Sequence, residues 1–223
     1  MMNKILLDKV ISYDKEGSYN LSLTDNSIIN LNSGNIKLYI VAQKEVQIEI
    51  NVRSDADVYF LSINSSNITI NLLEKGKINF SLIGASIDSK VEDVVSVNHK
   101  ARETVSNITL KGISNNYLKF VVNGVVEKGS VLSSCNQINR IVNVNSGLSA
   151  ILPNLYIDEF DAGANHSAYT GPFKEKDLFY LECKGIKRED AYSLLLEGFL
   201  KSDDLPYEFN HLVDDILKKI MRR

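Results

Sequence analysis

The feature that most constrains the fold is a short apolar alternation that returns about every ten residues between positions 26 and 157. It is clear at Ile36, Leu38 and Ile40, and it returns at Val46 and Ile48. Its further members are Ile50, Val58, Phe60, Ile68, Ile70, Leu72, Ile78, Phe80 and Leu82. Successive side chains of a strand point to opposite faces, so this period of two predicts many β-strands that each bury one face.

The segments between these predicted strands, such as "NSGN", "SDAD", "NSSN" and "EKGK", are made of residues that tolerate turns. Short strands at even spacing are compatible with a sandwich, a barrel or a solenoid. Several breaks are polar corners without the Asn-Gly or Asp-Gly signal of a tight hairpin. The apolar triplets also recur in a similar phase, as stacked coils require. The periodicity therefore favours a solenoid, with a sandwich as the alternative.

The pattern changes to a helical one near the C-terminus. Residues 175–183 and 188–200 have helical composition, with Gly185 where a helix would end and acidic residues in the first turn of the second segment. A third helix is expected after Pro206. Its apolar stripe consists of Phe209, Leu212, Val213, Ile216 and Ile220. We expect a β core over residues 1–172 and a small α-helical segment over residues 173–223.

Composition narrows the class of protein. The chain has 223 residues, of which 44% are hydrophobic and 24% charged, and its net charge is -3. These values predict a globular protein with no electrostatic preference for nucleic acid or for a membrane surface. No apolar run is long enough to span a membrane, and the N-terminus lacks the pattern of a signal peptide. Two cysteines are too few for a disulfide framework, so we expect a cytoplasmic, reducing setting.

No catalytic motif stands out. A GxSxG nucleophile motif and a phosphate-binding P-loop are both absent from the sequence, so we expect no enzymatic activity and no nucleotide bound by this chain itself. The residues that could ligate a metal are Cys135, Cys183, His99, His166 and His211. No CxxC, HxH or HExxH spacing connects them. A metal site would therefore be labile or shared between chains.

Each of these residues also has an ordinary structural interpretation. Cys183 lies among apolar residues and is expected in the core, since free cysteine is one of the most buried residue types. His211 falls on the polar side of the third helix and is expected in solvent. His99 fits a strand corner, and Cys135 fits a core thiol as well as a functional one. From the residues alone, His166 is expected in a loop or at a cap.

Four segments in order resemble the SufB/SufD family, the scaffold subunits of the SUF iron–sulfur cluster assembly machinery. They are residues 99–113 ("HKARETVSNITLKGI"), "CNQIN", "LPNLYIDEFDAGANHSAYTG" and "KDLFYLECKGIKREDAYSLLLEGFL". The similarity covers residues 90–202, and the last segment is its most specific part. It implies a mainly β protein, a right-handed parallel β-helix with a small C-terminal α-helical segment. It also implies a scaffold that catalyses no reaction alone.

The resemblance also implies a cofactor site. Cys135 falls where family members have a cysteine implicated as a cluster or sulfur ligand, and His166 falls on a histidine implicated in iron or cluster binding. A thiolate accepts sulfur and binds iron, and a neutral imidazole is a good iron ligand. A dimer, with itself or with a SufB/SufD paralogue, would build a shared site for a transient [2Fe–2S] or [4Fe–4S] cluster. A sulfur donor protein is a possible further partner.

A SufC-type ABC ATPase is the other implied partner, bound by the helical tail. We expect its contact on the exposed side of residues 188–200, around Tyr192, Glu197 and Phe199. We expect a short, minimal member of the family, without the N-terminal helical domain of longer members. The chain also has Ser167 where many members place a glutamate after the histidine. An acidic residue at 158, 159 or 161 is the candidate replacement.

Two other functions fit the same architecture. One is an interaction module that binds or regulates the ATPase without holding a cluster. The other is a polysaccharide-degrading enzyme, which would need acidic pairs along a solenoid groove. The acids at 158–161 are instead expected near the helical end, which counts against the enzyme.

Overall fold

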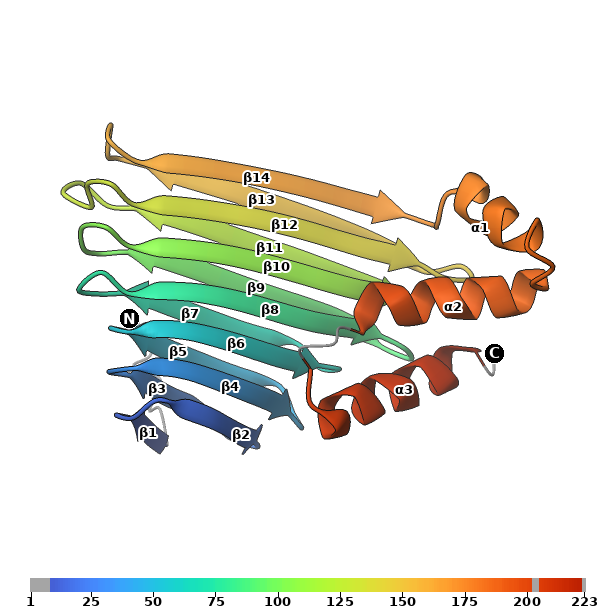
Figure 1. Cartoon of the computed structure of the whole chain (residues 1–223), viewed down its shortest axis with the longest axis horizontal. Coiled ribbons are helices and arrows are strands. Elements are labelled where there is room, and N and C mark those ends of the chain that lie inside the picture. Colours follow the sequence, from blue (N-terminus) through green and yellow to red (C-terminus); the bar gives the residue numbers. More distant parts are fainter. Residues whose placement is uncertain (1–8, 202–204, 222–223) are drawn as a thin grey trace.

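The computed structural model describes residues 9–201 and 205–221. Residues 1–8, where no signal peptide is expected, lie outside this range. The described chain forms strands followed by three helices (Figure 1). The strands are β1 (Lys9–Tyr13), β2 (Gly17–Leu23), β3 (Ser27–Leu31), β4 (Asn35–Ala42), β5 (Val46–Val52), β6 (Asp55–Ser62), β7 (Ser66–Leu72), β8 (Lys77–Ser86), β9 (Lys90–His99), β10 (Val105–Ser114), β11 (Tyr117–Val126), β12 (Ser134–Asn143), β13 (Leu148–Ile157) and β14 (Gly163–Gly171). The helices are α1 (Glu175–Glu182), α2 (Arg188–Leu200) and α3 (Tyr207–Met221).

The strands alternate between two parallel sheets. The odd-numbered strands form a seven-stranded sheet in the order β1 to β13, and the even-numbered strands form a second one from β2 to β14. Each turn of the chain thus adds one strand to each sheet, and Figure 1 shows the turns stacked on one another. This is a right-handed parallel β-helix, so the predicted fold class is confirmed.

The apolar residues at alternate positions point into the lumen of the β-helix and stack in columns. Leu38, Val58, Phe80 and Ile108 occupy equivalent register positions on β4, β6, β8 and β10. All four are at most 1% exposed. Burial of such columns stabilises the β-helix, because stacking the coils removes this apolar surface from water.

A ladder of one carboxylate and four amides on the outer face of the even-numbered sheet keeps the coils in register. Side-chain hydrogen bonds of 2.8–3.2 Å link equivalent positions on β6, β8, β10, β12 and β14. The members of this ladder are Asp57, Asn79, Asn107, Asn136 and Asn165. Because these residues face outward, their neighbours in sequence on each strand face the lumen.

The helices pack against one end of the even-numbered sheet (Figure 1). A second apolar cluster joins strand residues such as Tyr39, Leu61 and Val142 to the buried faces of α2 and α3. The predicted stripe of α3 is confirmed at four positions, whereas Leu212 is 37% exposed. The strands end at Gly171 and the helices begin at Glu175. The division into units at 172 and 173 stays a prediction.

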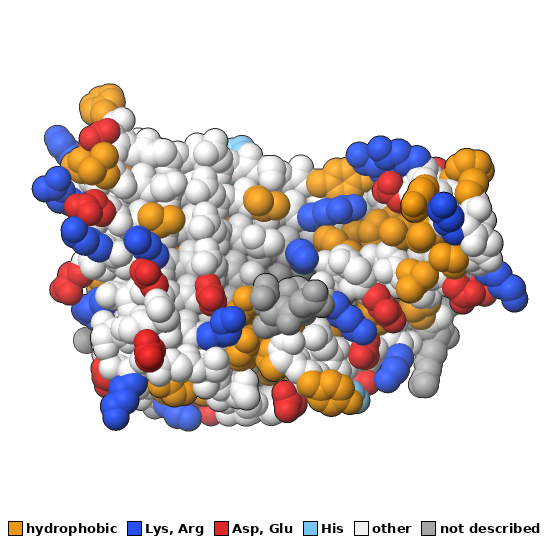
Figure 2. Space-filling view, in the orientation of Figure 1, with side chains coloured by type: hydrophobic (Ala, Val, Ile, Leu, Met, Phe, Trp, Pro, Cys, Tyr) orange, Lys and Arg blue, Asp and Glu red, His pale blue; other side chains and the backbone are white. Residues whose placement is uncertain are grey.

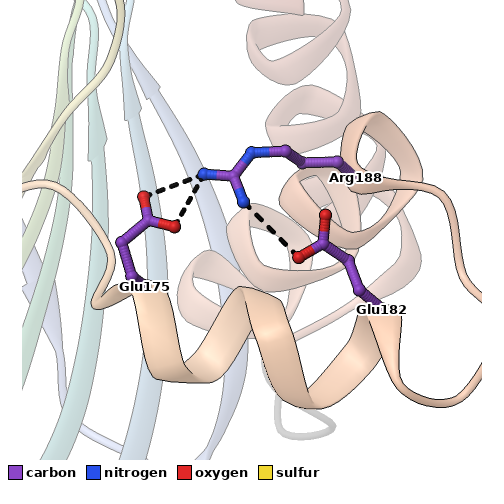
Figure 3. A network of polar contacts seen from close by, with 3 residues as sticks. All are labelled: Glu175, Glu182 and Arg188. Atoms are coloured by element: carbon purple, nitrogen blue, oxygen red, sulfur yellow. Dashed lines mark hydrogen bonds and ion pairs between the residues drawn. The ribbon is translucent and has the colours of Figure 1, made fainter.

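An exposed ionic network joins α1 to α2. The Arg188 guanidinium donates to both oxygens of Glu175 at 2.8 Å and to Glu182 at 3.5 Å (Figure 3). Gly185 has a φ of 84° and ends α1, as its position in the sequence predicts. In the described parts of the chain, no helix is long and apolar enough to cross a membrane.

Candidate functional site

Cys135 and His166 lie on neighbouring strands at the end of the even-numbered sheet. In the register of β12 and β14, Cys135 pairs with Ala164, and Gln137 pairs with His166. The outward amide ladder runs through Asn136 and Asn165, so Cys135, Gln137 and His166 all lie on the inward face. Strands are ~4.8 Å apart and residues advance ~3.3 Å, which puts the Cα atoms of Cys135 and His166 about 8 Å apart.

The Cys135 thiol is enclosed in the lumen. The residue is fully buried at 0% exposure. Burial raises the pKa of the thiol above its ordinary value, and hydrogen bonds with the side chains of Ser106 and Gln137 oppose that shift. A Cβ atom on Gly124 would lie 2.6 Å from Cys135 Sγ and 2.9 Å from Gln137 Nε2. A glycine on β11 therefore makes the space in which the thiol and the amide meet.

His166 is exposed on β14, the last strand of its sheet in the described chain. The prediction of a loop or capping position is wrong, because residues 163–171 pair in parallel with β12 along their whole length. Small residues at 163, 164 and 168 suggested a turn. They lie on a strand because the backbone ladder with β12, not side-chain propensity, determines its conformation.

Amide side chains enter the lumen face of the even-numbered sheet at β12. The column of Leu38 and Ile108 continues as Gln137 and then His166. The neighbouring column passes from Leu110 to Asn139. Gln137 and Asn139 are only 1% and 2% exposed, and their carbonyl oxygens Oε1 and Oδ1 have no hydrogen-bond partner. Sequence analysis missed both residues, although polar residues at every second position of "SCNQIN" were a visible signal.

A hydrogen-bonded chain leads from Cys135 into the opposite sheet. His99, at the end of β9, bonds Ser106 Oγ through Nε2 at 2.9 Å and Thr104 Oγ1 through Nδ1 at 2.8 Å. Ser106 in turn bonds the Cys135 thiol. His99 occupies a strand end as expected, but it is fully buried, and burial lowers its pKa from 6.5 to about 4.

The remaining metal-ligand candidates lie elsewhere. Cys183 is exposed at the end of α1, so its predicted core position is wrong; only Leu178 of that short helix is buried. The His211 side chain is 54% exposed, as predicted. Across residues 9–201 and 205–221, no three side chains of His, Cys, Asp or Glu converge as a metal site.

The acids before β14 are at the opposite end of the β-helix from the helices. Figure 1 shows the β13–β14 turn at that far end, so the expectation that residues 158–161 approach the helical end is wrong. The Glu159 carboxylate accepts hydrogen bonds from the backbone N–H groups of Gly129 and Asp161, and these bonds lower its pKa. Its role there is to hold the turn.

The predicted partner-binding residues on α2 are not all on its surface. Glu197 is exposed, whereas Tyr192 is half-buried and packs edge-on against Phe173 at 5.7 Å. Phe199 is 9% exposed and also packs against Phe173, so its predicted exposure is wrong. Leu194 replaces it at the surface, with 48% exposure. Figure 2 shows hydrophobic and basic side chains gathered over α1 and α2, beside a largely uncharged strand face.

Comparison with known proteins agrees with this geometry. Residues 63–199, more than half of the chain, match the family model described as the SufBD core domain of SUF-system FeS cluster assembly. The chain therefore belongs to the SufBD family.

Two relatives illustrate the relationship. An iron–sulfur cluster assembly SufBD family protein of Synechocystis is 32% identical over 126 residues, covering 53% of this chain and 26% of that protein. A protein of the same description from Staphylococcus haemolyticus is 27% identical over 125 residues, covering 54% and 27% respectively. The matched stretch thus spans about a quarter of these curated relatives.

Proposed function

We propose that this chain is a scaffold subunit for iron–sulfur cluster assembly, and that Cys135 and His166 hold the cluster or its iron as cargo. The observation that carries the proposal is their position on one inward face of adjacent strands at the end of the β-helix. A cysteine sulfur and an imidazole nitrogen are both established types of ligand for iron and for [2Fe–2S] centres.

Two donors are too few to hold a cluster, so we propose that a second subunit supplies the others. β13 and β14 each have a strand neighbour on one side only within the described chain. Apolar side chains are exposed along and between them, including Leu148 at 65%, Tyr156 at 58% and Ile157 at 40%. An unpaired sheet edge with apolar side chains favours pairing with another chain. That chain is a second copy or a SufB/SufD paralogue.

We further propose that a SufC-type ABC ATPase contacts the exposed side of α2. Glu197 and Leu194 are the surface residues there, and Tyr192 is partly accessible. The ATPase would supply nucleotide hydrolysis, for which this sequence carries no phosphate-binding motif. A scaffold of this kind works in the cytoplasm with its partners and catalyses no reaction by itself.

Anaerobic reconstitution with ferrous iron and sulfide tests the cluster. We expect a visible absorption band that is lost in Cys135→Ala and weakened in His166→Ala. Cys183→Ala and His211→Ala are matched controls, since both remove the same side-chain types at exposed positions. Equal cluster content in all four variants would contradict the proposal.

Full burial of Cys135 favours one second candidate, an interaction module in which this thiol is only a core residue. That function predicts no cluster under any reconstitution condition, together with retained binding of the ATPase. Cluster formation on reconstitution therefore distinguishes the scaffold from the interaction module.

A further inference from the structure

A cavity lies between the outer face of the even-numbered sheet and α2, and two cationic side chains line it. Its volume is about 580 Å³, and Lys111 of β10 and Arg140 of β12 form part of its wall. The two residues are register partners, so their backbones are one strand spacing apart, ~4.8 Å. Like charges at directly opposed positions of neighbouring strands repel each other. The fold therefore holds an unfavourable pair of positive charges at one cavity.

Neither cation has an acidic partner in the described chain. Within residues 9–201 and 205–221, neither Lys111 nor Arg140 forms an ion pair or a side-chain hydrogen bond. The Arg140 guanidinium instead lies 5.1–5.8 Å from the ring centroids of Tyr169, Phe173 and Phe199. Lys111 Nζ lies 5.8 Å from the Phe199 centroid. Aromatic faces attract a cation, but they leave the N–H groups of Arg140 without an acceptor, and its Nε atom is buried.

Partial burial makes the missing partner significant. Lys111 and Arg140 are both partly buried, whereas most lysines and arginines of a protein are fully solvated. Burial lowers the pKa of Lys111, and the positive charge of Arg140 lowers it further. An anion in the cavity would compensate both charges, and a carboxylate would accept N–H groups of the guanidinium in the paired geometry that arginine favours.

The lining of the cavity indicates which anion it suits. Asp177 also lines it, so its three charged side chains carry one net positive charge, which suits a monoanion better than a phosphate group. Ile138 and Leu194, at 60% and 48% exposure, form an apolar part of its surface. Figure 2 shows basic and hydrophobic side chains together in the region of the helices. Further lining side chains are apolar, namely Leu110, Phe173, Leu195 and Phe199.

We propose that this cavity binds an acidic side chain from a peptide segment of a protein partner, a segment in which apolar residues flank the acid. Arg140 and Lys111 are its anion-binding residues, and Ile138 and Leu194 contact the apolar neighbours. Leu194 also belongs to the surface of α2 to which the proposed function assigns the ATPase. The inference therefore rests on the proposed function for the identity of the partner, but not for the chemistry of the cavity.

Nuclear magnetic resonance of the full-length protein tests that chemistry with two blocked peptides, acetyl-Leu-Glu-Leu-amide and acetyl-Leu-Gln-Leu-amide. The reporter is the Nε–H signal of Arg140, identified by its absence in Arg140→Lys. We expect a saturable shift of this signal with the Glu peptide, and an affinity for the Gln peptide that is at least about tenfold lower. Equal affinities, an unmoved signal, or tighter binding of inorganic phosphate than of the Glu peptide would overturn the inference.

Variants separate anion binding from a structural role. Lys111→Met should bind the Glu peptide about tenfold more weakly, while Lys176→Met, at an exposed position outside the cavity, should bind it like the parent. Asp177→Asn should bind it more tightly, because it removes a like charge from the cavity. An affinity that does not follow these charges would contradict the inference. Asp203 and Asp204 lie outside the described residues, and a tenfold gain in Asp203→Asn/Asp204→Asn would mean that the chain's own acids compete for the cavity, against a partner.

Binding of a purified SufC-type ATPase to the same variants keeps this inference distinct from the proposed function. We expect Lys111→Met to weaken that binding by about tenfold, with Lys176→Met as the control. If the ATPase binds the parent and Lys111→Met equally, the partner named for the cavity is wrong and the proposed function stands. If the parent binds the Glu peptide but no ATPase, the cavity stands and the proposed ATPase contact is wrong.

Discussion

Asp93 offers a quantitative test of how burial in the lumen affects the ionisation of a carboxyl group. This residue of β9 is fully buried, and its Oδ1 atom accepts hydrogen bonds from Ser66 at 2.6 Å and Ser62 at 3.3 Å. Its Oδ2 atom has no partner and lies where a Cβ on Gly84 would come within 2.9 Å. Among residues 9–201 and 205–221, no cationic side chain pairs with this carboxyl group to compensate its charge. Burial therefore raises the pKa of Asp93 from 3.8 to about 7, although the two serines oppose the shift.

The size and sign of the effect follow from linkage. The rise of the Asp93 pKa from 3.8 to about 7 corresponds to about 4 kcal/mol in the free energy of unfolding. The unfolded chain ionises Asp93 above pH 3.8, while the folded chain holds the proton until about pH 7. The contribution of Asp93 to the free energy of unfolding is therefore fully present below pH 3.8, and it is lost as the pH rises to about 7.

Asp93→Asn is the informative substitution because the amide has the shape of the protonated acid and does not titrate. We expect equal stability of the variant and the parent near pH 4, and a variant that is more stable by up to about 4 kcal/mol at pH 8. His99 has the opposite pH dependence because its pKa is lowered. It destabilises the fold as the pH falls from 6.5 to about 4. It does so equally in both proteins and cancels in the difference.

Urea unfolding followed by circular dichroism, at several values between pH 4 and pH 8, measures this difference. Asp55→Asn, the same change at an exposed strand residue, is the control and should leave the pH profile unchanged. Parallel profiles for Asp93→Asn and the parent would refute the reasoning, because they would mean that the buried carboxyl does not ionise differently in the two states.

Two further predictions concern the thiols. Gly124→Ala should lower stability by about 1–3 kcal/mol in urea unfolding, since its methyl group would collide with Cys135 Sγ. It should also reduce cluster content on reconstitution. Gly198→Ala, where a Cβ meets nothing within 4 Å, should not reduce cluster content. Iodoacetamide should alkylate Cys183 in the native protein and Cys135 only after unfolding, as peptide mass spectrometry can measure, because one thiol is exposed and the other is buried. Equal labelling of both native thiols would contradict the described position of Cys135.

Much of the fold is readable from the sequence because lumen-facing positions must be apolar. Ile36, Phe60 and Phe80 were predicted inside and are at most 2% exposed. The helix over residues 188–200 was predicted with correct ends, but Phe199, which was expected on its exposed side, is buried. Three consecutive leucines at 194–196 allow more than one face, and packing against the sheet buries Leu196 while Leu194 stays at the surface. Packing against the sheet determines which face of this helix is buried, and the local periodicity of the sequence does not predict it.

The site was only partly predictable for a different reason. Cys135 and His166 were identified from a resemblance, whereas the residues between them in space were not. Connections between coils differ in length, so the register partner of a given residue cannot be counted from the sequence alone. Only the structure shows that Gln137 stands beside His166, and that Ser106 connects Cys135 to His99.

The polarity of the β12 coil is not a simple effect of closeness to solvent. If the lumen were polar there because water enters the end of the solenoid, its residues would show intermediate exposure, as the inward residues of β13 do. Instead Gln137 and Asn139 are 1% and 2% exposed, almost the same as Ile108 and Leu110 in the preceding coil at 1% and 0%. Leucine or isoleucine would fill these positions without an unsatisfied oxygen and would stabilise the chain. The sequence instead keeps amides at these positions, on the face that carries Cys135, and this choice lowers the stability of the fold. Such local conflicts between stability and sequence are expected at functional sites.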